Sequence, residues 1–262
     1  MNFSLAYTFF QTLSLGHLER SLYSISRQTK LPDDMVFFDN NTTFSEDVIK
    51  LTVAKHFNLS QWRFYFSKHG DTRKTSASWS QNQAIKLTVN DVLILARADI
   101  IYEFSCFGAL LKEFSLHSNN GINPLHFVTC HVKHMDYFNK SYTFETADDA
   151  ADLEPLKWRD DVQRLTATTG RNFTETHLDA VSFCTTKAAM AAVDWYDESL
   201  QSWGMWQQSL QMDMREKGIA THVIPETLMF HMQHGADRNT ARAMNEFNSS
   251  PRRSGIRNNF IP

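Results

Sequence analysis

The chain has 262 residues, enough for one large α/β domain or two small ones with a substantial hydrophobic core. With 42% hydrophobic residues, 21% charged residues and a net charge of −3, it is an ordinary globular protein without the strong basic character that drives general binding to nucleic acid or membranes. Three widely spaced cysteines without a CxxC pair, and no run of membrane-span length, indicate neither a disulfide framework nor a cysteine zinc site and favour a cytoplasmic protein.

The first 115 residues alternate apolar runs of strand length with segments of helical spacing. In chain order the expected elements are a strand at 3–10, a helix at 18–27, a strand at 35–38, a helix at 45–57, a strand at 62–66, a helix at 78–87 and a strand at 92–95. Ser45 is the expected N-cap of the second helix. Strands that alternate with helices predict a mainly parallel sheet with right-handed crossovers.

The pattern loosens beyond residue 115. In chain order the expectations are a strand at 126–132, an acidic, irregular or partly helical segment at 146–164, a helix at 188–193, a helix at 203–217 ended by Gly218, and a short strand at 220–224 before Pro225. The tail, residues 235–262, holds five arginines against two acids, a local charge of +3. We expect a flexible or surface-wrapping segment there, with an arm for an anionic ligand as the alternative.

The apolar run at residues 91–99 ends abruptly in Asp99. Such a run predicts a strand buried on both faces, and ligands of open α/β sheets collect beyond the carboxyl ends of these strands. Asp99 is therefore expected where a carboxylate can meet a metal, a phosphate or a sugar. The alternative is an acid that only marks the end of the strand.

Several segments, in this order, resemble the GT-A fold glycosyltransferases of the large family 2. They are the first helix at 18–29, the strand and turn at 36–43, the Ala-Arg-Asn-like helix start at 80–85, the DxD-like strand at 92–99, the Asp-Glu and Trp-Gly segments at 195–204, and the closing His region at 232–234. The resemblance covers residues 4–235 and implies a single α/β domain of GT-A (Rossmann-like) fold, with a central, mainly parallel sheet flanked by helices. It implies a nucleotide-sugar-binding half at 1–115, an acceptor-binding half at 116–235 and a basic C-terminal tail at 236–262.

The resemblance implies a glycosyltransferase that moves a sugar from a nucleotide-sugar donor, with a UDP-type donor slightly favoured, to an acceptor hydroxyl with inversion. The donor-binding residues that it indicates are Gln11, Thr12, Asp39, Arg73, Asn82, Arg97 and Asp99. Asp39 is placed to accept a hydrogen bond from a base N–H such as that of uracil. Alternatively, Asp39 only initiates a turn, and Asn82 only caps or packs a helix start.

The resemblance also implies a divalent cation that is held by the DxD motif and neutralises the donor diphosphate. Here Arg97 replaces the first acid of that motif, which leaves Asp99 and His234 as candidate ligands of Mn²⁺ or Mg²⁺. His231 and His234, three residues apart, are another candidate pair. Because an arginine opposes a cation and can itself pair with phosphate, we expect weak metal dependence.

A second departure concerns the general base. The family has Glu-Asp after its Gly-Trp-Gly segment, but this chain has Gln207 and Gln208, and glutamine cannot remove a proton at neutral pH. Asp197 is the candidate base, with Glu198 and Asp213 as other acids in reach.

The acceptor side is indicated by Trp203, Gly204, Trp206 and Gln207, although the two tryptophans can equally be core anchors. The acceptor is a glycan or, through the basic tail, a nucleic acid. Two alternatives follow: a non-catalytic subunit that binds a nucleotide sugar or assists assembly, and a glycosyltransferase that acts on a modified nucleic-acid base.

Overall fold

The computed structural model describes residues 1–10, 13–67, 76–119, 123–134, 182–201, 206–232 and 240–252. The strands in these ranges are β1 (Ser4–Phe10), β2 (Asp34–Asn40), β3 (Trp62–Phe66), β4 (Val92–Arg97), β5 (Ile100–Tyr102), β6 (His126–His134), β7 (Phe183–Thr186) and β8 (Ala220–His231). The helices are α1 (Leu15–Ser26), α2 (Glu46–Ala54), α3 (Ala77–Leu87), α4 (Cys106–His117), α7 (Lys187–Ala192), α8 (Trp206–Glu216) and α9 (Thr240–Ser249), with a 3₁₀ turn at Leu59–Gln61.

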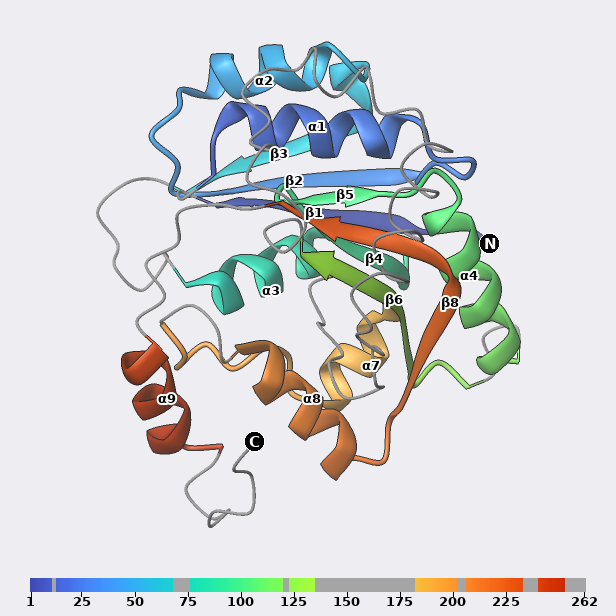
Figure 1. Ribbon diagram of the computed structural model, residues 1–262, viewed down its shortest axis with the longest axis vertical. Helices are drawn as coiled ribbons and strands as arrows, with labels where there is room; N and C mark the ends of the chain where they lie inside the picture. The colour runs from blue at the N-terminus through green and yellow to red at the C-terminus, as the bar shows by residue number, and fades with distance from the viewer. Residues whose placement is uncertain are drawn as a thin grey trace, which may run out of the picture.

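The described strands form one sheet in the order β3-β2-β1-β4-β7-β6-β8-β5 (Figure 1). All run in the same direction except β7 and β5, which pair antiparallel with their neighbours. Figure 1 shows α1 and α2 over one face and α3, α7 and α8 under the other. The predicted α/β fold, with a mainly parallel sheet between helices, is confirmed.

Local sequence signals explain where most helices begin and end. The Ser45 hydroxyl accepts a hydrogen bond from the Val48 amide at 3.4 Å, so the predicted N-cap of α2 is confirmed. Ser76 caps α3 in the same way. At the end of α8, Gly218 adopts φ +65°, a left-handed conformation that favours glycine, and it stops the helix where the sequence predicts.

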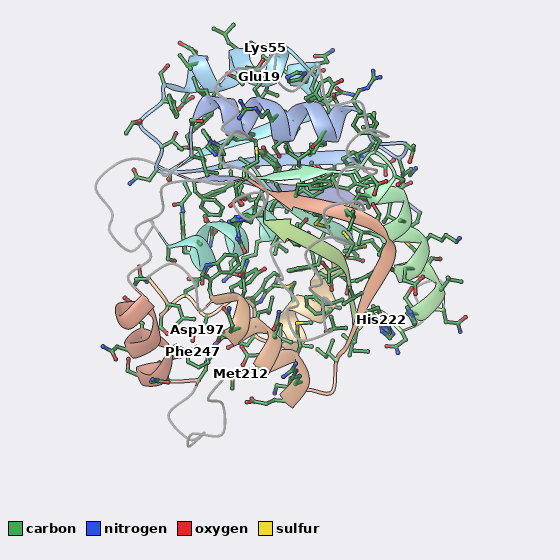
Figure 2. The ribbon with its side chains drawn as sticks, viewed as in Figure 1. Glu19, Lys55, Asp197, Met212, His222 and Phe247 are labelled. Carbon is green, nitrogen blue, oxygen red and sulfur yellow. The ribbon has the colours of Figure 1, made fainter. Side chains whose placement is uncertain are left out.

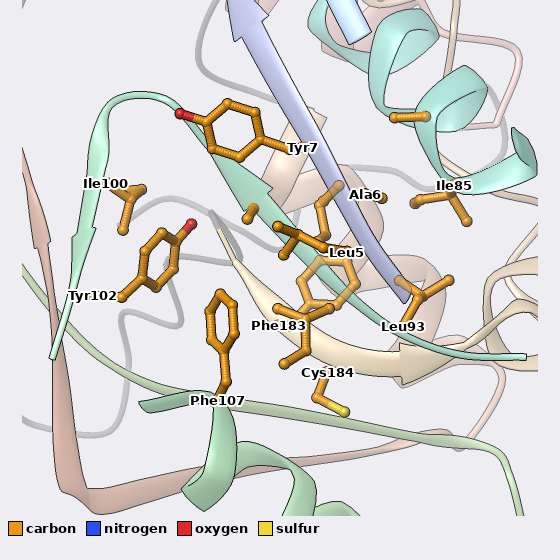
Figure 3. Close-up of a cluster of buried hydrophobic side chains, with 14 of the residues drawn as sticks. Leu5, Ala6, Tyr7, Ile85, Leu93, Ile100, Tyr102, Phe107, Phe183 and Cys184 are labelled. Atoms are coloured by element: carbon orange, nitrogen blue, oxygen red, sulfur yellow. The ribbon is translucent and has the colours of Figure 1, made fainter. Parts of the chain in front are cut away.

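The core lies where the first four parallel strands meet α4 and β7. Figure 3 shows five residues of this cluster, each from a different element: Tyr7 of β1, Leu93 of β4, Tyr102 of β5, Phe107 of α4 and Phe183 of β7. The rings of Tyr102 and Phe107 lie edge to face at 5.2 Å between centroids. Burial raises the pKa of Tyr102, so its hydroxyl stays protonated. Burial of each such ring contributes roughly 1.5–3 kcal/mol to the free energy of folding. This packing holds the strands β1 and β4, whose carboxyl ends carry the candidate site.

Some elements differ from those expected, among them helix α4 and strand β5, which were not predicted. Strand β8 does not end before Pro225 but continues to His231, because its register against β6 jumps from Cys130↔Ile224 to His131↔Leu228 and the intervening bulge accommodates the proline. Part of the basic tail forms helix α9, which the sequence analysis did not expect, and its contacts with Asp197 and Gln201 match the surface-wrapping alternative for that part. The acidic segment 146–164 lies outside the described residues. Within the described ranges, no helix has the length and apolar character needed to cross a membrane.

Candidate functional site

The carboxyl ends of β2, β1 and β4 bring the donor-side candidates to one edge of the sheet. Strand β1 lies between the other two, with Phe9 paired to Asp39 and Thr8 paired to Arg97. Asp39 and Arg97 therefore flank the end of β1 from either side. This is the edge at which open α/β sheets bind ligands.

Asp39 is buried and begins the turn that follows β2. Its Oδ2 accepts a hydrogen bond from the Thr42 amide at 3.3 Å, and Asn41 adopts φ +57°. The Ser67 hydroxyl after β3 accepts from the Asn41 amide at 2.7 Å, which ties the two strand ends together. The carboxylate thus has the geometry of an Asx turn while it lies at the ligand edge.

Arg97, Asp99 and His231 form a buried charged cluster. The Arg97 guanidinium is 2% exposed and makes an ion pair through its Nη2 atom with Oδ2 of Asp99, which is fully buried. Nε2 of His231 lies 3.0 Å from the same carboxylate oxygen. His231 reaches it because β5 pairs with β8, which sets Ile100 opposite His231, and because the Met232 amide donates to the Asp99 carbonyl at 2.8 Å.

Two aromatic rings fix the guanidinium of Arg97. Its Cζ lies 5.3 Å from the ring centroid of Phe10 and 5.3 Å from that of Trp206. The Trp206 ring in turn packs edge to face on Tyr196 at 5.4 Å. Trp206, which the sequence offers as an acceptor residue or a core anchor, thereby joins α8 to the donor-side edge.

The residues around Asp99 do not fit a divalent cation. Oδ2 of the Asp99 carboxylate already bonds the Arg97 guanidinium and the His231 imidazole, so a divalent cation at that oxygen would have to displace both. Among the residues that the structure describes, no group of three His, Cys, Asp or Glu side chains could hold a metal ion. His234 lies outside the described residues.

Asn82 of α3 clamps the turn that carries Asp197. Its Oδ1 accepts from the Tyr196 amide and its Nδ2 donates to the Tyr196 carbonyl, both at 3.0 Å. Nδ2 also donates to Oε1 of Glu198 at 2.8 Å. Asp194 and Trp195, just before, have φ +56° and +63°, a left-handed conformation that is strained for such side chains. The clamp holds this strained turn in place.

The Asp197 carboxylate is almost fully enclosed by hydrogen bonds. Oδ1 accepts from the Ser199 amide at 3.0 Å and from the Ser199 hydroxyl at 2.6 Å, and Oδ2 accepts from the Ser250 hydroxyl. Burial acts to raise the pKa of Asp197, but the hydrogen bonds from Ser199 and Ser250 and the nearby charge of Arg252 outweigh it. Its pKa therefore lies below the usual value. In Figure 2, Asp197 lies at the end of the molecule that carries α9, in keeping with its bond to Ser250, which follows that helix.

Arg252 follows α9 and holds the second candidate acid. Its Nη1 lies 3.2 Å from Oδ2 of Asp213 and donates to the Trp195 carbonyl at 2.9 Å, while Nη2 lies 3.3 Å from an oxygen of Asp194. The sequence analysis did not assign a role to Ser250 or Arg252. The positive charge of the tail is the one signal in the sequence that pointed to this segment.

Buried polar groups on α3 are a further feature missed by the sequence analysis. Gln81 is fully buried, and neither its amide nitrogen nor its amide oxygen has a hydrogen-bond partner in the described part of the chain. The buried Ser78 hydroxyl, one turn earlier, is in the same state. Such groups require an explanation, and an absent ligand is one.

The remaining candidates are less informative. Gln207 is buried on α8. The others lie outside the described residues: Gln11, Thr12, Arg73, Trp203 and Gly204.

Comparison with known proteins identifies the fold. No family model and no curated protein matches the sequence. The structure is similar to GalNAc-T7, solved with UDP, GalNAc and Mn²⁺, with a TM-score of 0.59 and 12% identity over 89% of this chain and 44% of the other. It is also similar to S. aureus TarS 1-349 in complex with UDP, with a TM-score of 0.55 and 12% identity over 96% of this chain and 67% of the other.

Both structures are GT-A glycosyltransferases, and this chain has their α/β fold. At 12% identity the likeness shows the fold alone. The chain spans less than half of the GalNAc-T7 chain, at 44%.

Proposed function

We propose that this protein is a glycosyltransferase that transfers a sugar from a nucleotide-sugar donor, with a UDP-type donor favoured, to an acceptor hydroxyl with inversion. The observation that carries the proposal is the shared edge of β2, β1 and β4 in a GT-A fold, where Asp39 and the Arg97–Asp99 pair flank one strand end. The two similar structures were solved with UDP, which supports this choice of donor. A cytoplasmic location, expected from the cysteine usage, is part of the proposal.

On the donor side, Asp39 accepts a hydrogen bond from an N–H of the base, and Gln11 and Thr12 contact the base and ribose. Arg73 adds positive charge for the diphosphate. The buried amide of Gln81 supports a polar ligand near the start of α3. Because the residues around Asp99 do not suit a divalent cation, we expect Mn²⁺ or Mg²⁺ to affect donor binding only weakly.

On the acceptor side, Asp197 takes the proton of the acceptor hydroxyl as that oxygen attacks the anomeric carbon and the nucleoside diphosphate leaves. A general base must be ionised, and the lowered pKa of Asp197 keeps it so at neutral pH. Trp203, Gly204, Trp206 and Gln207 form the acceptor side of the proposal.

A non-catalytic subunit that binds a nucleotide sugar is the second candidate. It is favoured by the contacts of the two candidate acids, because Asp197 bonds Ser250 and Asp213 pairs with Arg252. Neither carboxylate can receive a proton from an acceptor without competing with these contacts. Donor binding without transfer would be the signature of this candidate.

A donor screen by thermal unfolding, followed by a transfer assay, tests the proposal. UDP and UDP-sugars are compared with GDP, CDP and ADP, because a ligand that binds the native state raises its apparent stability. We expect a uridine diphosphate to give the largest rise. Absence of a rise with every nucleotide overturns both candidate functions, whereas a rise without transfer to glycan or nucleic-acid acceptors supports the second.

A further inference from the structure

The geometry points to Arg97 as a built-in cation of the donor site, which contacts the donor diphosphate in place of a metal ion. The inference rests on the proposed function and deepens it by assigning the charge that offsets the leaving group. It rests on three observations: the position of Arg97 at the end of β4, the contacts that fix its guanidinium, and the bonds that the Asp99 carboxylate makes to Arg97 and His231.

The place of Arg97 is the carboxyl end of β4, across β1 from Asp39. If the base of a nucleotide is bound at Asp39, its diphosphate extends along the strand ends toward β4. A positive charge at this end is therefore located where the phosphate oxygens would lie.

The guanidinium is held in one orientation. Its Cζ lies over the rings of Phe10 and Trp206, 5.3 Å from each ring centroid, and its Nη2 atom is paired to Asp99. The main chain of Arg97 is fixed as well, because its amide donates to the Tyr102 hydroxyl at 3.0 Å and its carbonyl accepts from the Ser21 hydroxyl at 3.1 Å. A fixed guanidinium plane suits bidentate contacts with phosphate oxygens.

Asp99 serves the arginine rather than a metal. Its Oδ2 bonds both the guanidinium and Nε2 of His231, so Asp99 and His231 act as positioning residues for the Arg97 charge. A divalent cation bound to this carboxylate would lie next to a permanent positive charge and would be repelled. GalNAc-T7, by contrast, was solved with Mn²⁺ alongside UDP.

Calorimetric titration of UDP into the wild-type protein, in EDTA and then in Mn²⁺, is the first test. We expect dissociation constants within about threefold of each other, because the guanidinium contributes the charge-assisted hydrogen bonds in both conditions. UDP binding that appears only with Mn²⁺ overturns the inference but upholds the proposed function. Absence of UDP binding in both conditions overturns the proposed function and the inference with it.

Arg97→Asp and Arg97→Lys extend the test. In Arg97→Asp we expect UDP affinity in EDTA to fall by at least about tenfold, the scale of one charge-assisted hydrogen bond, and Mn²⁺ to restore part of it because two carboxylates then stand beside His231. Arg97→Lys keeps the charge without the fork, so we expect an intermediate affinity that is indifferent to metal.

Arg63→Gln is the matched control. Arg63 lies on β3 and pairs with Asp34 at the opposite end of the strands, with Nη2 to Oδ1 at 2.7 Å, so its removal should leave UDP affinity and metal response unchanged. Unchanged UDP affinity in a folded Arg97→Asp protein overturns the inference. If Arg97→Asp does not unfold cooperatively, Arg97→Lys is compared with the wild type in EDTA instead, and equal UDP affinity of these two proteins overturns the inference.

Discussion

At Asp197, burial and hydrogen bonding act in opposite directions on the same carboxyl group. Burial alone would raise its pKa and make it a stronger base, as in many general acids and bases. The two hydroxyls and one amide that bond it reverse the shift. The carboxylate is thus held ionised, at the cost of basicity, unless the acceptor hydroxyl displaces Ser199 or Ser250.

Substitution of Asp197 tests whether it is the general base. We expect Asp197→Asn to lower sugar transfer by about 10²–10⁴-fold, the usual effect of losing a general base, with UDP affinity nearly unchanged. Asp213→Asn is the matched comparison, since Asp213 is also buried and paired with Arg252. Transfer that survives in Asp197→Asn and falls in Asp213→Asn would show that Asp213 is the base and that the acceptor hydroxyl does not lie at Asp197.

Asp39 provides the corresponding test for the donor. We expect Asp39→Ala to weaken UDP binding by about 1–3 kcal/mol, because a charge-assisted hydrogen bond to the base is lost. Asp39→Asn keeps an oxygen that can accept from the Thr42 amide, and so separates the turn from the ligand contact. The exposed Asp47→Asn is the control. If calorimetry gives the same UDP affinity for folded Asp39→Ala and wild type, Asp39 does not belong to the donor site.

At the scale of elements, the turn between α7 and α8 depends on side chains from far along the chain. Asn82 from α3 binds both backbone groups of Tyr196, and Arg252 from beyond α9 binds the Trp195 carbonyl. The left-handed residues Asp194 and Trp195 would be unfavourable without these partners. Asn82 and Arg252 therefore set the position of Asp197, the residue that comes directly after Tyr196 in the chain.

Loss of the Asn82 side chain should destabilise the protein. We expect Asn82→Ala to lower the free energy of unfolding by about 2–4 kcal/mol, because the Tyr196 amide and carbonyl are left unpaired in a buried place. The neighbouring half-buried Gln83→Ala is the control and should change it by less than about 0.5 kcal/mol. Urea unfolding of the two variants measures the difference. Equal midpoints would mean that the turn does not depend on Asn82.

Three histidines, His117, His126 and His222, form a cluster near the ends of α4, β6 and β8. Nδ1 of His126 lies 3.1 Å from Nε2 of His222, and the rings of His117 and His222 stack at 3.4 Å, with Glu113 2.9 Å from His117. Figure 2 shows His222 on β8, far from Asp197. Burial, followed by the charge of His117, lowers the pKa of His126 and His222.

Because the folded-state pKa of these two histidines is lowered, the unfolded chain binds protons more readily as pH falls. At pH values above about 6.5, the pKa of unfolded histidine, they have no effect; below it, stability declines until the folded-state pKa is passed. We expect the melting temperature to fall between pH 7.5 and 5.5, and to fall less in His222→Gln. An identical slope in wild type and variant would exclude this cluster as the cause.

The elements that the sequence predicted are those with strong local signals. Helix α2 has a serine cap and an apolar face, and β1 is a mainly apolar and aromatic run of strand length. Helix α4 was not predicted, although residues 107, 110, 111 and 114 are buried at helical spacing. It lacks the local start signal that marks α2, because Ser105 before it makes no side-chain cap. The predicted strand at 220–224 ends before Pro225 because a proline normally ends a strand. The bulge that lets β8 continue appears only in its pairing with β6, which the local sequence does not show.

The residues of the candidate site also fall into two groups: those with a local signal in the sequence and those placed only by long-range contacts. Asp39 and Asp99 were predicted at strand ends because an apolar run followed by an acid is visible locally, whereas Arg97 was indicated by the resemblance to the DxD-like strand. The bond from His231 to Asp99 spans 132 residues and depends on the pairing of β5 with β8, which no local pattern encodes. Ser250 and Arg252 likewise reach Asp197 and Asp213 across 53 and 39 residues of chain.

At the scale of the whole molecule, charge bears on the choice of acceptor. The chain carries a net charge of −3, and the basic tail is the part that could attract nucleic acid. Arg252 of that tail is already committed to Asp213 and to three backbone carbonyls. The tail therefore contributes part of its charge to holding the protein together rather than to an external polyanion.

Binding to duplex DNA and RNA at two salt concentrations checks this last point. We expect affinity no tighter than the roughly 10⁻⁴–10⁻⁶ M of non-specific binding at physiological salt, because a chain with net negative charge and one committed tail arginine gains little from counterion release. The comparison uses 50 mM and 200 mM salt, between which a protein with 6–10 phosphate contacts loses about 10³–10⁵ in affinity. Arg252→Gln supplies the control: it should lower the melting temperature by freeing Asp213, yet leave the weak nucleic-acid binding as it was. Tight binding that falls steeply with salt would contradict the expectation and favour a nucleic-acid acceptor over a glycan.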